Sequence, residues 1–193
     1  MLVHEPIQTH KQHYTVDEFE QFLCQPENVD RLFELIDGEI VEKKPTQQHG
    51  MIAMNLGAEL TFFVKKHKLG RVGGEVRHRT AKDTVNSLMP DISFTSGNRP
   101  LVTEGSVMQM PDLAIEIRSP DDSLKQMREK AEYYLANGSR LVWLVVPGKR
   151  YVEVHRPNQE EEIMFGSDVL DGGDVLPGFT LPIADVFADQ AGE

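Results

Sequence analysis

The chain has 193 residues, and 31 Asp and Glu against 20 Lys and Arg give it a formal net charge of −11. This balance argues against a protein that coats nucleic acid generally, because non-specific affinity comes from neutralising phosphates with cations. The charge balance does not exclude an enzyme that binds DNA through one local basic patch. The length predicts a single domain, placed at 14–188 between flexible tails at 1–13 and 189–193.

Two further features limit the class of protein. The only cysteine is Cys24, which excludes an internal disulfide and a cysteine-based zinc cluster. The N-terminus has no basic segment followed by an apolar stretch, and no run of ~18 apolar residues occurs in the sequence. We therefore expect a cytoplasmic protein that does not associate with membranes.

Three helices are predicted. The first follows a capping box in which Thr15 accepts from the N–H three residues on and Glu18 reaches back, and it should end before Pro26. Apolar residues at helical spacing predict a long helix over 46–68, with a cationic last turn. A third helix is expected over 123–137.

The strands are predicted from a turn signal and from apolar runs. Residues 32–42 are typical of a β-hairpin, because Asp37-Gly38 tolerates the positive φ angles of a tight turn. Glu34 lies in its first strand, among apolar neighbours. Further strands are predicted at 71–80, 90–94, 112–117, 141–146, 151–155 and 161–165, and an extended tail with a short terminal turn at 175–181. This order of elements predicts an α/β fold, a mixed central sheet flanked by helices.

Acidic residues interrupt segments that should be buried. Burying a lone ionised carboxylate is costly, so such a group pairs, titrates or binds a metal. Asp112 and Glu116 share one strand face but stand ~13 Å apart, at ~3.3 Å per residue, which is too far to share a cation. Asp91, on a neighbouring strand, is the natural partner of Glu116. Two carboxylates on adjacent strands can hold Mg²⁺, which takes few protein oxygens and several waters.

Short motifs follow one another in an order that points to a known family. They are Phe33 to Glu39, His49 at the start of the long helix, Pro90-Asp91, the segments 111–120 and 128–138, Trp143 to Pro147, and 176–181. Together they resemble the Uma-type predicted endonucleases, a bacterial family of the PD-(D/E)XK restriction-endonuclease-like superfamily. The resemblance implies a core of αβββαβ order, here with an N-terminal helix and hairpin and extra C-terminal antiparallel strands. It also implies a metal-dependent endonuclease that hydrolyses DNA phosphodiester bonds.

Carried over by position, the resemblance assigns roles to four residues. Asp91 and Glu116 become the ligands of Mg²⁺ or Mn²⁺, Lys130 a catalytic cation, and Glu34 an additional acid. The lysine that usually stands two residues after the glutamate is replaced by Arg118, so Lys130 on the following helix is expected to substitute for it. Arg118 is a fixed cation and cannot serve as a general base.

Structural explanations compete with each of these roles. Asp91 after a proline is typical of a cap or a turn, and Glu116 could form a buried ion pair with Arg118 or Lys130. Lys130 could instead pair with Gln126 or Glu34, or face solvent. His49 is typical of packing near a helix start, and Asp112 of a carboxylate that accepts backbone N–H groups at the strand entrance.

Two other functions remain open beside the nuclease. One is a nuclease-fold binding or assembly protein, favoured by the net charge and the missing motif lysine, and the other is a hydrolase of small phosphate esters. The densest basic stretch comprises Lys65, Lys66, Lys68, Arg71, Arg77, Arg79 and Lys82. If it lies beside the acids the nuclease is favoured, whereas a ring of acids there favours the binding protein. Analogy with nucleases of this fold, which pair to cut both strands, suggests a homodimer.

Overall fold

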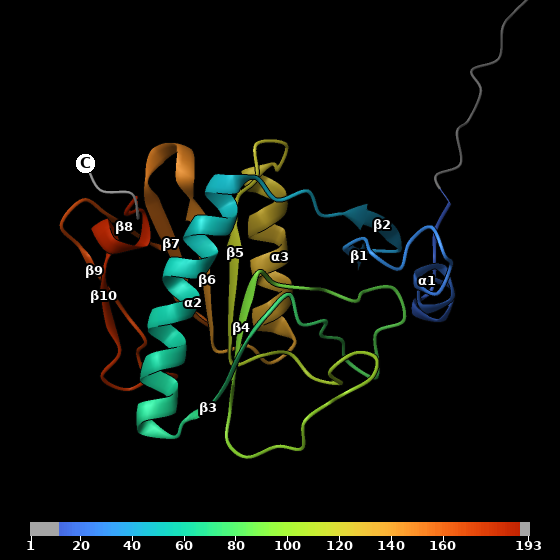
Figure 1. Ribbon diagram of the computed structural model, residues 1–193, viewed down its shortest axis with the longest axis horizontal. Coiled ribbons are helices and arrows are strands. Elements are labelled where there is room, and N and C mark those ends of the chain that lie inside the picture. The colour runs from blue at the N-terminus through green and yellow to red at the C-terminus, as the bar shows by residue number, and fades with distance from the viewer. Residues whose placement is uncertain (1–11, 190–193) are drawn as a thin grey trace, which may run out of the picture.

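Figure 1 shows the computed structural model, which describes residues 12–189. Its centre is a six-stranded mixed sheet in the order β3-β4-β5-β6-β7-β8. The strands are β3 (Gly70–Gly74), β4 (Ile92–Ser96), β5 (Leu113–Ile117), β6 (Leu141–Val146), β7 (Tyr151–His155) and β8 (Glu162–Phe165). β5 and β6 are parallel, and the other neighbouring pairs are antiparallel. The predicted α/β class and mixed sheet are confirmed.

Two helices cover opposite faces of this sheet (Figure 1). Helix α2 (Gln47–His67) packs on the face that carries Ile115 and Trp143, and α3 (Leu124–Ala136) on the face that carries Ala114 and Val142. Successive side chains of a strand point to opposite faces, so β5 and β6 are buried on both sides. This explains their nearly continuous apolar sequences.

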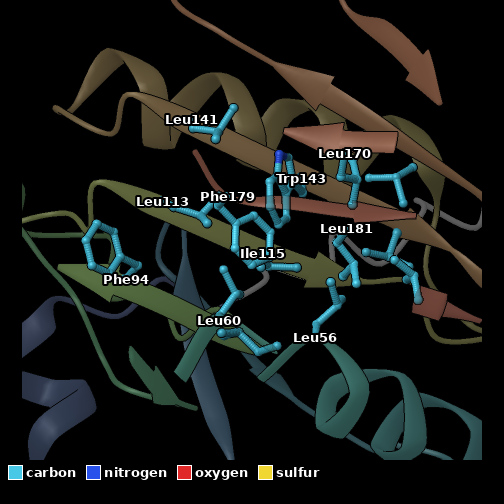
Figure 2. Close-up of a cluster of buried hydrophobic side chains, with 14 of the residues drawn as sticks. Leu56, Leu60, Phe94, Leu113, Ile115, Leu141, Trp143, Leu170, Phe179 and Leu181 are labelled. Carbon is cyan, nitrogen blue, oxygen red and sulfur yellow. The ribbon is translucent and has the colours of Figure 1, made fainter. Parts of the chain in front are cut away.

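The C-terminal segment closes the core on the α2 side, and here the sequence prediction was incomplete. The tail expected at 175–181 belongs to a β-hairpin of β9 (Val169–Asp171) and β10 (Thr180–Pro182), followed by α4 (Ile183–Val186). Phe179 stacks on Trp143 with ring centroids 6.1 Å apart, and leucines of this hairpin join the same apolar cluster (Figure 2). The hairpin forms because these apolar side chains need a buried surface, which only the folded sheet supplies.

The remaining elements are an N-terminal helix, a β-hairpin and a short 3₁₀ turn. Helix α1 (Val16–Leu23) has the predicted capping box, and β1 (Phe33–Ile36) and β2 (Glu39–Glu42) form the predicted hairpin. The 3₁₀ turn η1 (Pro147–Lys149) joins β6 to β7. The strand predicted at 71–80 stops at Gly74, because Glu75 adopts a positive φ of 51° that ends the extended conformation. Within residues 12–189 no helix is long and apolar enough to cross a membrane.

The hairpin turn has the backbone that its residues favour. Asp37 and Gly38 have φ angles of 48° and 77°, and the backbone N–H of Asp37 donates to the Asn86 side chain at 2.7 Å. Leu35 forms an antiparallel bridge with Ser87, in the loop that leads to β4. The hairpin is therefore attached to the segment that precedes β4, and this attachment brings Glu34 to the main sheet.

The loop that leads to β4 also contains a buried histidine, whose burial should make the stability of the protein depend on pH. The side chain of His78 is almost wholly buried, with Nδ1 2.9 Å from the carbonyl oxygen of Gln109. Burial lowers the pKa of His78, although the hydrogen bond to Gln109 opposes this. The folded-state pKa is thus below the unfolded value of about 6.5, so the unfolded chain binds the proton more readily. The contribution of His78 to stability is present above pH ~6.5 and is lost as the pH falls.

We therefore expect wild type to lose more free energy of unfolding between pH 7.5 and pH 5.5 than His78→Gln does, by up to ~1.4 kcal/mol per pH unit. Urea denaturation followed by circular dichroism at a series of pH values measures this difference. Parallel stability curves for the two proteins would contradict the prediction, because they would mean that His78 binds its proton equally in both states.

Candidate active site

Two carboxylates from neighbouring strands face each other at one end of the sheet. β4 and β5 pair with Ile92 opposite Ile115, and this antiparallel register places Asp91 opposite Glu116. Both side chains are almost wholly buried, with exposed fractions of 3% for Asp91 and 7% for Glu116. The backbone N–H of Ile117 donates to Asp91 Oδ2 at 2.6 Å, so the strand itself holds the aspartate. The sequence prediction that these acids are adjacent is consistent with this register.

Asp91 is paired with a lysine and a histidine from the segment around the start of α2. Lys43, directly after β2, places Nζ 2.5 Å from Asp91 Oδ1 and also donates to the carbonyl oxygen of Met89. His49, in the first turn of α2, places Nε2 3.1 Å from Asp91 Oδ2. Burial alone would raise the pKa of Asp91, but the His49 hydrogen bond and the Lys43 charge outweigh it and hold that pKa well below its usual range. Asp91 is therefore ionised near neutral pH.

Glu116 is paired with two side chains from α3. Lys130 Nζ lies 2.7 Å from Glu116 Oε1, and the Tyr134 hydroxyl donates to the same oxygen at 2.7 Å. Lys130 and Tyr134 are four residues apart and so lie on one face of the helix. Burial raises the pKa of Glu116 to about 7, although the charge of Lys130 opposes this. The same burial, and the nearby carboxylate, raise the pKa of Tyr134.

Glu34 of β1 completes the cluster. The Lys130 ammonium lies 2.8 Å from the Glu34 carboxylate, and the backbone N–H of Met89 donates to Glu34 Oε1 at 2.6 Å. Lys130 therefore bridges Glu34 and Glu116. Burial would lower the pKa of Lys130, but the charges of Glu116 and Glu34 outweigh it and raise that pKa. Lys130 is a fully charged ammonium, held in place by two carboxylates.

The four residues proposed from the sequence thus lie together, and two of the competing explanations are decided. Arg118 does not pair with Glu116, because its Nε donates to the carbonyl oxygen of Asp122 at 3.0 Å. Asp112 lies at the other end of β5, where its Oδ2 accepts from the backbone N–H and the hydroxyl of Ser96 at 2.8 and 2.9 Å. Lys130 rather than Arg118 is the cation beside Glu116.

Sequence reasoning missed two members of the cluster. Lys43 lies in a short link between hairpin and helix, and nothing in its local pattern distinguishes it from the neighbouring Lys44. The Tyr134 ring lies in the α3-side core, while its hydroxyl contacts Glu116. The hydroxyl of a buried tyrosine normally forms a hydrogen bond. This general rule is the one signal in the sequence that could have indicated a polar contact of Tyr134.

The charges in the cluster bear on whether it suits a metal ion. Three carboxylates face two ammonium groups, and His49 lies beside Asp91. Within residues 12–189, no group of three or more His, Cys, Asp or Glu side chains is spaced to hold a metal ion. Mg²⁺ needs only one or two carboxylates, since waters complete its shell. The carboxylates of Asp91 and Glu116 supply oxygen atoms of the kind that Mg²⁺ prefers, and these oxygens contact Lys43, His49 and Lys130, which a bound ion would have to displace or share.

A groove on the surface reaches one side of the cluster, at Asp91 and His49. The groove has a volume of about 1020 Å³ and runs between α2 and the edge strand β3. Asp91 and His49 line it at the end where α2 begins. Asp91 is thus the carboxylate of the cluster that lies nearest to the groove.

Comparison with known proteins identifies the family of the chain. No match was found among curated proteins. The solved structure described as a "putative nuclease belonging to DUF820 from Anabaena variabilis" is similar to this chain, with a TM-score of 0.77 and 29% sequence identity. The similarity covers 90% of this chain and 97% of that one. The family model Uma2, described as "Putative restriction endonuclease", matches residues 17–184, nearly the whole chain, and this protein therefore belongs to the Uma2 family.

Proposed function

We propose that the protein is a divalent-metal-dependent endonuclease that hydrolyses DNA phosphodiester bonds. The observation that carries the proposal is the pairing of Asp91 with Glu116 across β4 and β5, with the Lys130 ammonium 2.7 Å from Glu116. Acids opposed on adjacent strands, with a cation beside one of them, are the chemical groups that phosphodiester hydrolysis needs. Membership of a family described as restriction endonucleases supports the same reaction class.

Each side chain would have a distinct role. Asp91 and Glu116 would hold Mg²⁺ or Mn²⁺, which when bound polarises a phosphate oxygen and lowers the pKa of a bound water. Lys130 would stabilise negative charge on the phosphate in the transition state, because a fixed cation in a site that excludes water is effective there. Its raised pKa keeps it protonated, so it would not act as a general base. Glu34 would position Lys130 through the 2.8 Å contact.

Lys43 and His49 would keep the aspartate ionised and oriented. Lys43 also contacts the carbonyl oxygen of Met89, so it links Asp91 to the segment before β4. The rival function, a binding or assembly protein that keeps the fold, would need the same residues only as a neutralised ion-pair network. The two functions differ in whether the carboxylates take up a metal ion.

Calorimetric titration of wild type with Mn²⁺ and Mg²⁺ tests the proposal. We expect wild type to bind the ion, Glu116→Gln to lose most of this binding, and Asp112→Asn to retain it. Asp112 is the matched control, since it lies on the same strand but contacts Ser96 at the opposite end. Wild type should also cleave DNA, offered as duplex plasmid and as single-stranded circles, only with the ion present, and Glu116→Gln should cleave neither.

Absence of both metal binding and cleavage in wild type would support the binding protein instead. Loss of binding in Asp112→Asn as strongly as in Glu116→Gln would point to a general effect on folding. Circular dichroism of all three proteins separates that effect from a local one.

A further inference from the structure

The groove beside the candidate site is lined mainly by residues that have no role in that site. Its floor and walls are small or apolar along most of its length, including Gly57, Ala58 and Val72. A Cβ built on Gly57 would meet only Ile92, at 3.9 Å, so the small residues leave the floor open rather than making close contacts. The groove is therefore a shaped surface next to Asp91.

Two large apolar side chains stand exposed on this surface. Met54 and Phe62 line the groove and have exposed fractions of 66% and 69%. They are eight residues apart on α2, which is ~12 Å at ~1.5 Å per residue. Exposed aromatic and thioether side chains at this spacing offer flat or deformable surfaces to planar groups.

The two ends of the groove also differ in charge, with lysines at one end and acids at the other. Lys65 and Lys66 line the end where α2 finishes, and both are exposed. Across the part of the chain that the structure describes, no ion pair involving either lysine was found. Asp91 and His49 line the other end, and Glu75 is the remaining acid in the lining. From His49 to Lys65 the helix rises ~24 Å, at ~1.5 Å per residue.

We propose that this groove binds single-stranded DNA, with bases stacked against Phe62 and Met54, phosphates near Lys65 and Lys66, and the strand continuing to Asp91. The proposal rests on the proposed nuclease function and names its substrate. Surfaces for single strands combine a cationic path for the backbone with aromatic side chains for the bases.

A duplex is a poorer fit to the same surface. Duplex binding depends on many neutralised phosphates, and this groove offers two lysines in a chain of net charge −11. Base stacking adds affinity that does not come from neutralised phosphates, so a single strand is better suited than a duplex to a groove with few cations. Of the basic stretch only Lys65 and Lys66 line the groove, and the Arg77 guanidinium sits over the Phe19 ring at 5.5 Å.

Fluorescence anisotropy of a labelled oligothymidylate, in EDTA so that no cleavage occurs, tests the inference. We expect wild type to bind this oligonucleotide more tightly than a duplex of equal length. Phe62→Ala should weaken the binding by about 5- to 150-fold, the range for removal of a stacking side chain. Lys65→Gln and Lys66→Gln should each reduce the slope of log affinity against log salt by ~0.7.

Two matched control variants accompany these. Phe165→Ala removes an equally exposed phenylalanine from β8, at the opposite edge of the sheet. Lys82→Gln removes an exposed lysine next to Asp83, whose carboxylate accepts from Tyr133 on the α3 side. Both controls should bind the oligonucleotide as wild type does.

Three results would overturn the inference: no binding of the oligonucleotide, equal binding of the duplex, or Phe62→Ala that binds like Phe165→Ala. A change of oligomeric state in Phe62→Ala, with binding unaltered, would instead identify the groove as a contact between copies of the chain and would also overturn it. Failure of the proposed function looks different. In that case the oligonucleotide binds and Phe62→Ala weakens it, but no metal ion brings about cleavage.

Discussion

Replacement of Asp91 by asparagine should reduce metal-dependent DNA cleavage by about 10³-fold or more. A bound divalent ion stabilises charge in the transition state by several kcal/mol, and each 1.36 kcal/mol corresponds to a factor of ten in rate. Asparagine has nearly the same shape as aspartate but lacks the negative charge. The variant should keep its hydrogen bond from the Ile117 backbone N–H, because the amide oxygen can still accept it. Cleavage of single-stranded circular DNA and of plasmid DNA at saturating Mn²⁺ measures the effect.

Asp91→Asn also removes the ion-pair partner of the buried Lys43 and so is expected to destabilise the fold. A double variant separates this effect from the loss of activity. Without the aspartate charge, Lys43 Nζ would lose the partner that lies 2.5 Å away. Loss of one member of a buried pair is destabilising, whereas loss of both members is often close to neutral. Asp91→Asn/Lys43→Met should therefore fold more stably than Asp91→Asn and remain inactive. Substantial cleavage by either variant would show that Asp91 is not required for the reaction.

Replacement of Lys130 by methionine should destabilise the protein by roughly 3–5 kcal/mol at pH 8, the range for removing one partner of a buried ion pair. The Lys130 side chain is 11% exposed and contacts carboxylates that are 7% and 4% exposed. Without the ammonium group, Glu116 and Glu34 would be buried without their shared cation. Buried carboxylates respond by taking up protons, so the loss of stability should be smaller at pH 5.5 than at pH 8. Urea unfolding at both pH values measures it.

Lys125→Met on the same helix is the matched control. Its side chain is 85% exposed and pairs with Glu129 in an i,i+4 arrangement, so the change should cost at most ~0.5 kcal/mol at either pH. Adding Glu34→Gln to Lys130→Met should recover part of the stability, because it removes one of the uncompensated charges. Equal stability of Lys130→Met and Lys125→Met would show that Lys130 does not hold the cluster together.

The sequence predicted a helix, strand or turn correctly where the pattern involved only residues that are neighbours in the chain. Asp37-Gly38 specified the hairpin turn, Thr15 and Glu18 specified the start of α1, and the apolar run after Asp112 specified a strand buried on both faces. Each of these signals depends on residues that are neighbours in the sequence. The hairpin of β9 and β10 was not predicted, because its three-residue strands are too short for a periodic pattern and depend on contact with Trp143 and α2.

For the candidate site, too, the sequence determined some features and the tertiary structure decided others. The sequence by itself determined that Asp91 and Glu116 are acids in or beside buried strands, and that they need partners. Tertiary structure decided which partners they have: Lys43 reaches Asp91 across 48 residues of sequence, and Lys130 reaches Glu34 across 96. The groove, too, exists only once α2 is packed beside β3. The physical reason is that local patterns fix backbone conformation and burial, whereas the partner of a buried charge depends on which distant segments the packing of the core brings together.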